Sequence, residues 1–254
     1  MISTQEKPRF LKLEFDIIAN GDCALDIRFS AEPSELLSRY IIGLRQYILK
    51  QDDLKVIDLI PAYQCLTITF DPLLYLDESL SREVKTLTKK FLKATNSHFL
   101  EREPCVIRIP VCYENSFAPD MLTVSEYTGL TPEEIIELHS TSVYLVHMLG
   151  FSPGFLYLGG LDPKLHCPRK EAPRLHIPAG AVGIGGGQTG IYPQATPGGW
   201  QIIGQTPIKL FQPYSTSPFI AQPLDTIEFY SISESEFNDI APQVQCKYSK
   251  ESYP

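Results

Sequence analysis

Three side chains that could carry chemistry lie close together between Leu165 and Arg174. His166 has an imidazole, which titrates near neutrality and can therefore take up or release a proton. Arg169 and Arg174 have guanidinium groups, whose planar array of N–H donors matches a carboxylate or a phosphoryl group. This combination favours an anion-binding site with a proton-transfer group beside it. A structural hydrogen bond for His166 and surface salt bridges for the two arginines remain open alternatives.

Two further groups lie in the same glycine- and proline-rich stretch. The run from Gly185 to Gly190 offers bare backbone amides, and such a turn can form a nest of N–H groups for an anion. Thr196 comes shortly before Trp200, the only tryptophan of the chain. The alternative is that the turns serve shape alone, because glycine permits and proline fixes particular backbone conformations. If the stretch is an anion-binding site, we expect ligand oxygens to be bound by Gly186, Gly187, Gln188, Thr189 and Thr196.

Familiar nucleotide and nucleophile motifs do not fit this stretch. The run from Gly185 to Gly190 has the form GxGxxG, but Pro193 and Pro197 follow, so the helix that a dinucleotide-binding fold needs cannot form. The chain has no GxxxxGK[ST] motif and no recognisable set of metal ligands. Cys167 and His166 are neighbours, and in an extended segment their side chains point to opposite faces. We therefore expect Cys167 to be a small apolar core residue and not a nucleophile.

Length and composition bound the class of protein. The chain has 254 residues, 43% of them hydrophobic and 20% charged, which gives room for one large or two small globular domains. A net charge of −8 argues against a nucleic-acid partner, which would favour a basic face. No apolar run approaches the roughly 20 residues that span a bilayer, and no apolar signal segment is visible. Six scattered cysteines without a CxxC pair are typical of reduced thiols. We therefore predict a soluble cytoplasmic protein that has no membrane partner and no metal site.

The elements that must position these groups form two regions. In the first, which we assign to residues 1–100, apolar residues alternate with polar ones at strand period or recur at helical period. The order ββαββα predicts an α+β sandwich in which helices cover one face of an antiparallel sheet. The expected strands cover residues 10–18, 24–29, 56–60 and 65–70, and the expected helices cover residues 33–50 and 79–95.

Residues 96–104 are polar and charged, and we expect the boundary between two domains there. The second domain is assigned to residues 104–254. It opens with an expected strand at residues 105–111 and a short helix at residues 123–128. The last part of the chain, residues 231–254, is polar and acidic and predicts a surface helix followed by a loose tail.

A longer helix is expected to start at Thr131, which can form a capping box, and to run to Leu149. His139 lies on the apolar side of this helix. It is therefore either a core histidine or a group that points into a cleft, and we include it among the candidate substrate-binding residues. His147 would lie ~12 Å further along the helix axis, too far for both imidazoles to bind one metal ion.

The glycine-rich stretch itself predicts short strands joined by tight turns. We interpret the second domain as β-barrel-like, with polar groups held on stiff turns. The expected strands are residues 155–158, 181–184 and 200–203 within the stretch, and residues 208–211 and 226–230 after it.

The region from Ile109 to Thr206 closely resembles a bacterial family known as the B subunit of 5-oxoprolinase, allophanate hydrolase subunit 1 or inhibitor of the sporulation kinase. Leu156 is a minor departure from the pattern, which has proline at that position. The residues that carry the resemblance include Glu137-Leu138-His139-Ser140, Gly150, Phe151, Pro153-Gly154-Phe155, Tyr157-Leu158, Pro168-Arg169, Pro173-Arg174, Pro178-Ala179-Gly180, Val182-Gly183, Gln188-Thr189-Gly190, Tyr192-Pro193 and Thr196-Pro197-Gly198-Gly199-Trp200.

The resemblance implies a cyclophilin-like β-barrel as the C-terminal domain and a stable partnership with a similarly folded C subunit of the enzyme. Together with an A subunit, such a complex cleaves 5-oxoproline to L-glutamate with hydrolysis of ATP, which we expect to be held jointly with one of the partners. On this reading His166 and Arg169 are catalytic, and the remaining candidates bind substrate. The alternatives are a non-catalytic inhibitor of a histidine kinase, as in some spore formers, and a carboxyltransferase component related to urea amidolyase.

Overall fold

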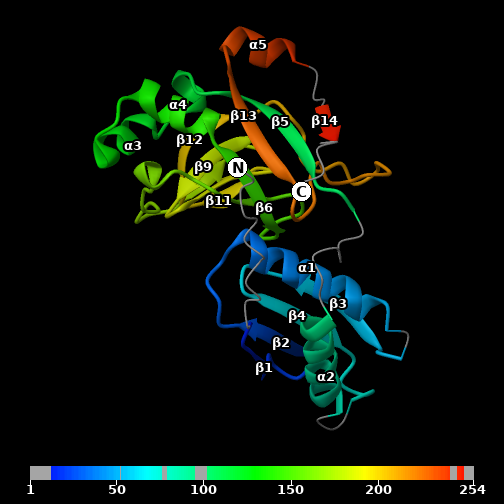
Figure 1. The fold of residues 1–254 in the computed structure, drawn as a ribbon. Coiled ribbons are helices and arrows are strands. Elements are labelled where there is room, and N and C mark those ends of the chain that lie inside the picture. Colours follow the sequence, from blue (N-terminus) through cyan, green and yellow to red (C-terminus); the bar gives the residue numbers. More distant parts are fainter. Residues whose placement is uncertain (1–12, 52, 76–78, 95–101, 241–244, 249–254) are drawn as a thin grey trace, which may run out of the picture. The chain divides into compact units, whose positions relative to one another are not determined.

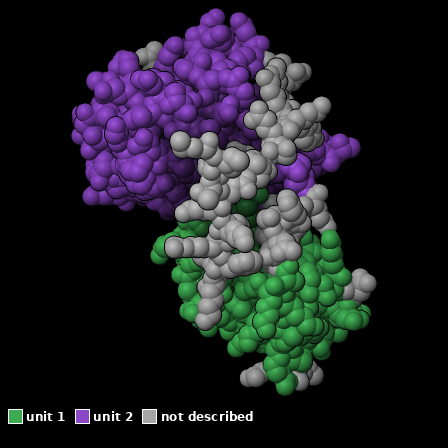
Figure 2. All heavy atoms as spheres, in the orientation of Figure 1, with its two compact units in different colours: residues 1–100 green, residues 101–254 purple. Residues whose placement is uncertain are grey.

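The computed structural model describes residues 13–51, 53–75, 79–94, 102–240 and 245–248. The chain forms two compact units, Met1–Leu100 and Glu101–Pro254 (Figure 2). Each unit has its own hydrophobic core. The segment expected to separate two domains, residues 96–104, lies largely outside the described residues, so the domain division stays a proposal.

The N-terminal unit is an antiparallel sheet of four strands in the order β1-β2-β4-β3, with two helices (Figure 1). Alternate residues of one sheet face, such as Leu66 and Ile68, pack with the helices in one core. Ser34 caps the first helix, because its hydroxyl accepts a hydrogen bond from the Leu37 amide at 3.2 Å. The predicted order ββαββα is confirmed. The elements are β1 (Phe15–Ala19), β2 (Ala24–Phe29), α1 (Glu35–Leu49), β3 (Val56–Pro61), β4 (Cys65–Phe70) and α2 (Ser79–Ala94).

The C-terminal unit is built around a closed barrel of seven strands in the order β12-β9-β10-β7-β6-β13-β5. The pairing of Gln205 on β12 with Cys112 on β5 closes it, and β14 adds to β5 outside the ring. The predicted β-barrel is thus confirmed. Its seven strands are β5 (Cys105–Cys112), β6 (Val143–Leu149), β7 (Leu156–Gly159), β9 (Ala181–Gly185), β10 (Gln188–Ile191), β12 (Gln201–Gln205) and β13 (Thr226–Ile232), and the added strand β14 covers Gln245–Tyr248.

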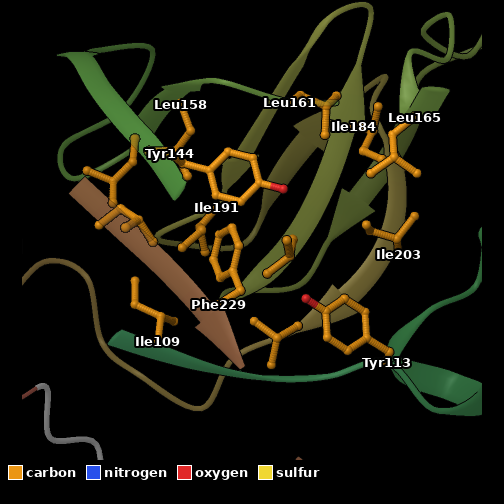
Figure 3. Packing of buried hydrophobic residues seen from close by; sticks show 14 of the residues in the cluster. Ile109, Tyr113, Tyr144, Leu158, Leu161, Leu165, Ile184, Ile191, Ile203 and Phe229 are labelled. Atoms are coloured by element: carbon orange, nitrogen blue, oxygen red, sulfur yellow. The ribbon is translucent and has the colours of Figure 1, made fainter. Parts of the chain in front are cut away.

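The barrel interior is filled by side chains and is not an open channel. Figure 3 shows Leu158, Ile184, Ile191 and other apolar residues from several strands converging on the centre. The rings of Tyr113 and Tyr144 enter the same core, and their hydroxyls point inward. The helices α3 (Met121–Thr128) and α4 (Pro132–Thr141) lie beside the barrel in Figure 1.

A two-stranded ribbon of β8 (Arg174–Ile177) and β11 (Thr196–Gly198) packs on the outside of the barrel. A second, smaller core lies between them, and its members include Phe155 just before β7, Tyr192 and Trp200. The sequence did not predict this ribbon as strands, because β8 and β11 are very short. In addition, β11 contains proline and glycine, which are poor strand formers.

The predicted helix from Thr131 to Leu149 is wrong in its second half. The helix starts as expected, with the capping box of Thr131 and Glu134, but it ends at Thr141. Ser142 has an extended backbone, and Val143–Leu149 forms β6 between β7 and β13. Valine and tyrosine favour strands, and the pairing that closes the barrel outweighs a helical pattern of apolar residues. His139 lies on α4 and His147 on β6, so the expected spacing of the two residues along one helix is also wrong.

Two other predictions near the C-terminus need correction. Residues 208–211 do not form a strand; only one isolated bridge joins Phe211 to Phe219. The predicted surface helix exists as α5 (Glu234–Asp239), but the expected loose tail contains β14, which pairs with β5. A free strand edge on β5 explains why a polar segment is recruited into the sheet.

Candidate functional site

The segment from Leu165 to Arg174 is fixed to the rest of the unit by backbone contacts. Cys167 and Gly186 exchange two hydrogen bonds, with the Gly186 amide donating at 2.8 Å and the Cys167 amide at 3.2 Å. The carbonyl of Pro168 accepts a hydrogen bond from the buried Gln201 side chain at 3.1 Å. The Lys170 amide donates to the Gly199 carbonyl at 2.7 Å. The backbone of this loop is therefore held in place on both sides of Arg169.

The side chains of Lys170 and Arg174 add a buried ionic anchor. Both cations donate to the carboxylate of Asp120, which is 2% exposed and lies just before α3. Arg174 makes two hydrogen bonds to it, one of them at 2.6 Å, and Lys170 donates at 3.0 Å. Arg174, a predicted substrate-binding residue, is thus engaged in an internal ion pair. Asp120 was not predicted, because an aspartate before a short helix looks like any other helix cap.

Arg169 is placed differently. It is exposed, and within the described part of the chain no acidic group or hydrogen-bond acceptor pairs with it. Its guanidinium carbon lies 5.7 Å from the centre of the Trp200 ring, a cation–π arrangement that orients the group but leaves its N–H donors open. By contrast, the other described arginines of the C-terminal unit all face carboxylates, namely Arg102 with Asp225, Arg108 with Glu228 and Arg174 with Asp120.

The layer under Arg169 is aromatic and largely buried, with Tyr157 half-buried at its margin. Trp200 meets Phe155, Tyr157 and Tyr192 edge to face, with ring centres 5.6–6.4 Å apart. Burial raises the pKa values of Tyr157 and Tyr192, and the nearby charge of Arg169 partly opposes this rise. Both phenols therefore remain neutral and can donate hydrogen bonds at physiological pH. These tyrosines were absent from the predicted site, because a sequence cannot show which aromatic residues gather around one tryptophan.

His166 is exposed and lies at the tip of the β9–β10 hairpin. A Cβ atom at Gly187 would lie 3.0 Å from Cε1 of the His166 ring, so the ring rests directly over this glycine. The structure thus brings His166 together with Gly186 and Gly187, as the sequence suggested. The Gly186 amide, however, donates to Cys167 and is not free for an anion. As expected, Cys167 itself points the other way, into the barrel core.

Within the run from Gly185 to Gly190, Gly186 and Gly187 form the two-residue turn between β9 and β10. Gly186 has φ = 67°, a left-handed conformation that favours glycine. No helix follows the turn, which agrees with the rejection of a dinucleotide-binding motif. Gln188, the first residue of β10 after the turn, is half-buried, and Thr196, on β11, is half-buried in the outer ribbon.

His139 and Thr189 lie inside the barrel core. Neither side chain is exposed. The imidazole of His139 contacts the Tyr113 hydroxyl at 2.8 Å and the Thr189 hydroxyl at 2.9 Å, and its ring stacks on Phe229 at 4.7 Å. Burial lowers the pKa of His139 to about 3, so the ring is neutral. His139 thus occupies the core position that was the alternative to substrate contact. Thr189, which was expected to bind ligand oxygens, lies in the same core, and we do not include either residue in the surface site.

A nucleoside triphosphate with Mg²⁺ does not fit this set of residues. Such a ligand carries several negative charges and requires a phosphate-binding turn and oxygen ligands for the metal. Here the Gly186 amide is occupied, and Arg169 is the arginine of this loop whose donors remain open. The described residues contain no group of three or more histidine, cysteine, aspartate or glutamate side chains suited to a metal. The helices in the described part of the chain are also too short or too polar to cross a membrane.

Comparison with known proteins identifies related sequences along most of the chain. Residues 15–221 match the family model described as carboxyltransferase domain, subdomain C and D. Curated relatives named as the B subunit of 5-oxoprolinase share 37–50% of aligned residues with it. The one from Bacillus subtilis (strain 168) is 37% identical over 235 residues, which cover 90% of this chain and 97% of that protein.

Solved structures extend the comparison to longer proteins. TTHA0988 is 33% identical with a TM-score of 0.69; the match covers 83% of this chain, which spans only 40% of that one. The urea carboxylase of Kluyveromyces lactis matches 96% of this chain and 24% of its own, with a TM-score of 0.78 and 18% identity. At that identity the likeness is one of fold alone.

Proposed function

Because this chain belongs to the family of 5-oxoprolinase B subunits, we propose that it is the B subunit of an ATP-dependent 5-oxoprolinase. The complex, with the A and C subunits, would open 5-oxoproline to L-glutamate in the cytoplasm. The observation that carries the site assignment is Arg169, an exposed guanidinium held over Trp200 on a fixed loop and without an acidic partner in the described structure.

5-Oxoproline has one carboxylate and a five-membered lactam ring. Arg169 would bind the carboxylate through two parallel N–H donors, the geometry that distinguishes arginine from lysine. Tyr157, which is half-buried against Trp200, would offer an apolar wall for the ring. Since the backbone on both sides of Arg169 is already fixed, little conformational freedom remains to be lost when the ligand binds.

Ring opening needs a proton at the leaving nitrogen. Water adds its oxygen to the ring carbonyl carbon, the carbon–nitrogen bond breaks, and the nitrogen becomes the amine of glutamate. His166 is exposed and at the edge of the same loop, so it is the residue that would hold this proton. Amide resonance makes the carbonyl weakly electrophilic, and ATP hydrolysis would drive the step. We assign ATP to a partner in the complex or to a site that a partner completes, because the residues of this surface do not fit it alone.

The test is to purify the chain alone and together with its cognate A and C subunits. The account predicts a hetero-oligomer that hydrolyses ATP when 5-oxoproline is added and not when urea is added, whereas the isolated chain shows no such turnover. Turnover by the isolated chain would contradict the shared site. Carboxylation of urea by a complex that contains a biotin carrier, or inhibition of a histidine kinase without any turnover, would instead support one of the two alternative functions.

A further inference from the structure

One buried carboxylate organises the candidate site without facing the ligand. Asp120 accepts hydrogen bonds from Arg174 and Lys170 and, at 2.7 Å, from the amide of Ile202 on β12. Its own amide donates to the Ile202 carbonyl at 2.9 Å. Asp120 is therefore tied to a position two residues after Trp200 and, at the same time, to the loop that carries Arg169.

Asp120 binds some but not all of the cations of the neighbouring loop. The loop presents three cations close in sequence, namely Arg169, Lys170 and Arg174. The last two point their donors at the single carboxylate of Asp120. Burial alone would raise the pKa of Asp120, but the hydrogen bonds from Arg174, Ile202 and Lys170 outweigh this effect and lower it. The carboxylate is thus charged, and it holds two of the three cations.

We infer that Asp120 is a positioning residue that fixes the loop and keeps Lys170 and Arg174 away from the ligand, so that the site accepts a single carboxylate and not a polyanion. This inference rests on the proposed site at Arg169. If all three cations were open, phosphate, pyrophosphate and nucleotides would compete strongly with a monocarboxylate, because binding of a polyanion grows with the number of free cations. With Asp120 in place, Arg169 alone has its guanidinium donors open.

A different buried aspartate provides a matched control. Asp225 is 3% exposed, is paired with Arg102 at 2.5 Å and accepts the Cys105 amide at 2.8 Å. Cys105 begins β5, whereas β12 pairs with the other end of β5, about 23 Å away at 3.3 Å per residue. Asp225→Asn therefore disturbs a similar buried ion pair far from the loop.

The first experiment uses the fluorescence of Trp200, the only tryptophan of the chain, and needs no assumption about activity. The quenching constant for iodide, an anion, is divided by the quenching constant for acrylamide, which is neutral. The ratio of the two constants then reports the local charge around the indole. We expect Asp120→Asn to raise this ratio roughly two- to threefold, because the substitution removes a unit negative charge close to Trp200. Asp225→Asn should leave the ratio unchanged. An unchanged ratio in folded Asp120→Asn would overturn the inference.

A second pair of variants covers the case in which Asp120→Asn does not fold. Arg169→Gln removes the open cation and should lower the quenching ratio clearly. Lys170→Gln removes a cation whose amine is held at Asp120, whereas the Arg169 guanidinium lies over the Trp200 ring, so it should lower the ratio less. Equal effects of the two substitutions would place the Lys170 charge as close to Trp200 as that of Arg169 and would contradict the inference.

The complex then separates this inference from the proposed function. With every chain wild-type, pyrophosphate should inhibit 5-oxoproline turnover weakly. In the complex that contains Asp120→Asn, inhibition by pyrophosphate should strengthen about tenfold while the KM for 5-oxoproline rises, which a general loss of folded protein would not produce. If the wild-type complex turns over no 5-oxoproline, the proposed function fails, and the quenching experiment still decides the role of Asp120.

Discussion

The imidazole Nε2 of His139 lies 2.9 Å from the hydroxyl oxygen of Thr189 in the middle of the barrel. The Thr189 hydroxyl donates to the Gly183 carbonyl at 3.0 Å, so it accepts from His139, and Nε2 carries the proton. Nδ1 is then the acceptor for the Tyr113 hydroxyl. With these directions, the hydrogen bonds from Tyr113 through His139 and Thr189 to the Gly183 carbonyl are all satisfied while the imidazole is neutral. His139 is therefore a structural residue of the barrel core.

Replacement of His139 by alanine should destabilise the protein. The change removes a packed ring and leaves the buried Tyr113 and Thr189 hydroxyls without their partner, which costs about 2–4 kcal/mol of unfolding free energy. Urea unfolding measures it. His176→Ala, at an exposed position of β8, is the control and should be neutral. A His139→Ala protein with unchanged stability but no activity in the complex would instead place the histidine in the reaction.

The stability of the protein should depend on pH through the same residue. Burial depresses the pKa of His139 from 6.5 to about 3, so the unfolded chain binds a proton in this interval that the folded chain does not. The contribution of His139 to the free energy of unfolding is fully present above about pH 6.5. It decreases as the pH falls, by at most about 1.4 kcal/mol per pH unit. Unfolding curves at several pH values between about 4 and 7 should show a weaker slope for His139→Gln. Equal slopes for the variant and the wild type would be inconsistent with a neutral buried imidazole.

A glycine under the tryptophan should be essential for the placement of Arg169. A Cβ atom at Gly185 would lie 2.6 Å from the Trp200 indole, so Gly185→Ala must displace the ring and the guanidinium above it. We expect a loss of about 1–3 kcal/mol in stability and a shifted tryptophan emission. Gly150→Ala is the control, because its Cβ would meet its nearest neighbour at an ordinary 3.7 Å. An unshifted spectrum for Gly185→Ala would contradict this packing.

Limited proteolysis tests the division into two domains. The polar segment at residues 96–104 should be cut first and leave a folded fragment that starts close to Cys105, because that residue begins a strand of the barrel. Mass spectrometry and thermal melting of the fragment check this. If both halves melt only together and the segment stays uncut, the two units are one domain.

Sequence reasoning worked best where the pattern was local. The ββαββα order of the N-terminal unit follows from periodicity, and the capping box of Thr131 and Glu134 located the start of α4. It failed at Val143–Leu149, where apolar residues fit a helix and a strand equally well. Only the pairing of β6 with β7 and β13 within the barrel decides between them.

The candidate site shows the same division between local and distant information. His166, Gly187 and Arg169 were identified from residue type, and the structure places the first two in contact. Arg174 has the same residue type as Arg169, yet it is bound to Asp120, which lies 54 positions earlier. No local pattern distinguishes an arginine that meets a distant carboxylate from one that faces solvent. Which of the two keeps its donors open was therefore beyond the sequence.

The central claim is that Arg169 binds the carboxylate of the substrate, and the most direct measurement is kcat/KM for 5-oxoproline in the complex with the A and C subunits. Arg169→Lys keeps the charge but loses the planar pair of donors, so we expect kcat/KM to fall roughly ten- to hundredfold, or about 1.5–3 kcal/mol, with unchanged stability. Arg108→Lys is the matched control, since Arg108 also lies over an aromatic ring, 5.3 Å from the centre of Tyr230, but pairs with Glu228. Full activity of Arg169→Lys, or an equal loss in Arg108→Lys, would contradict the account.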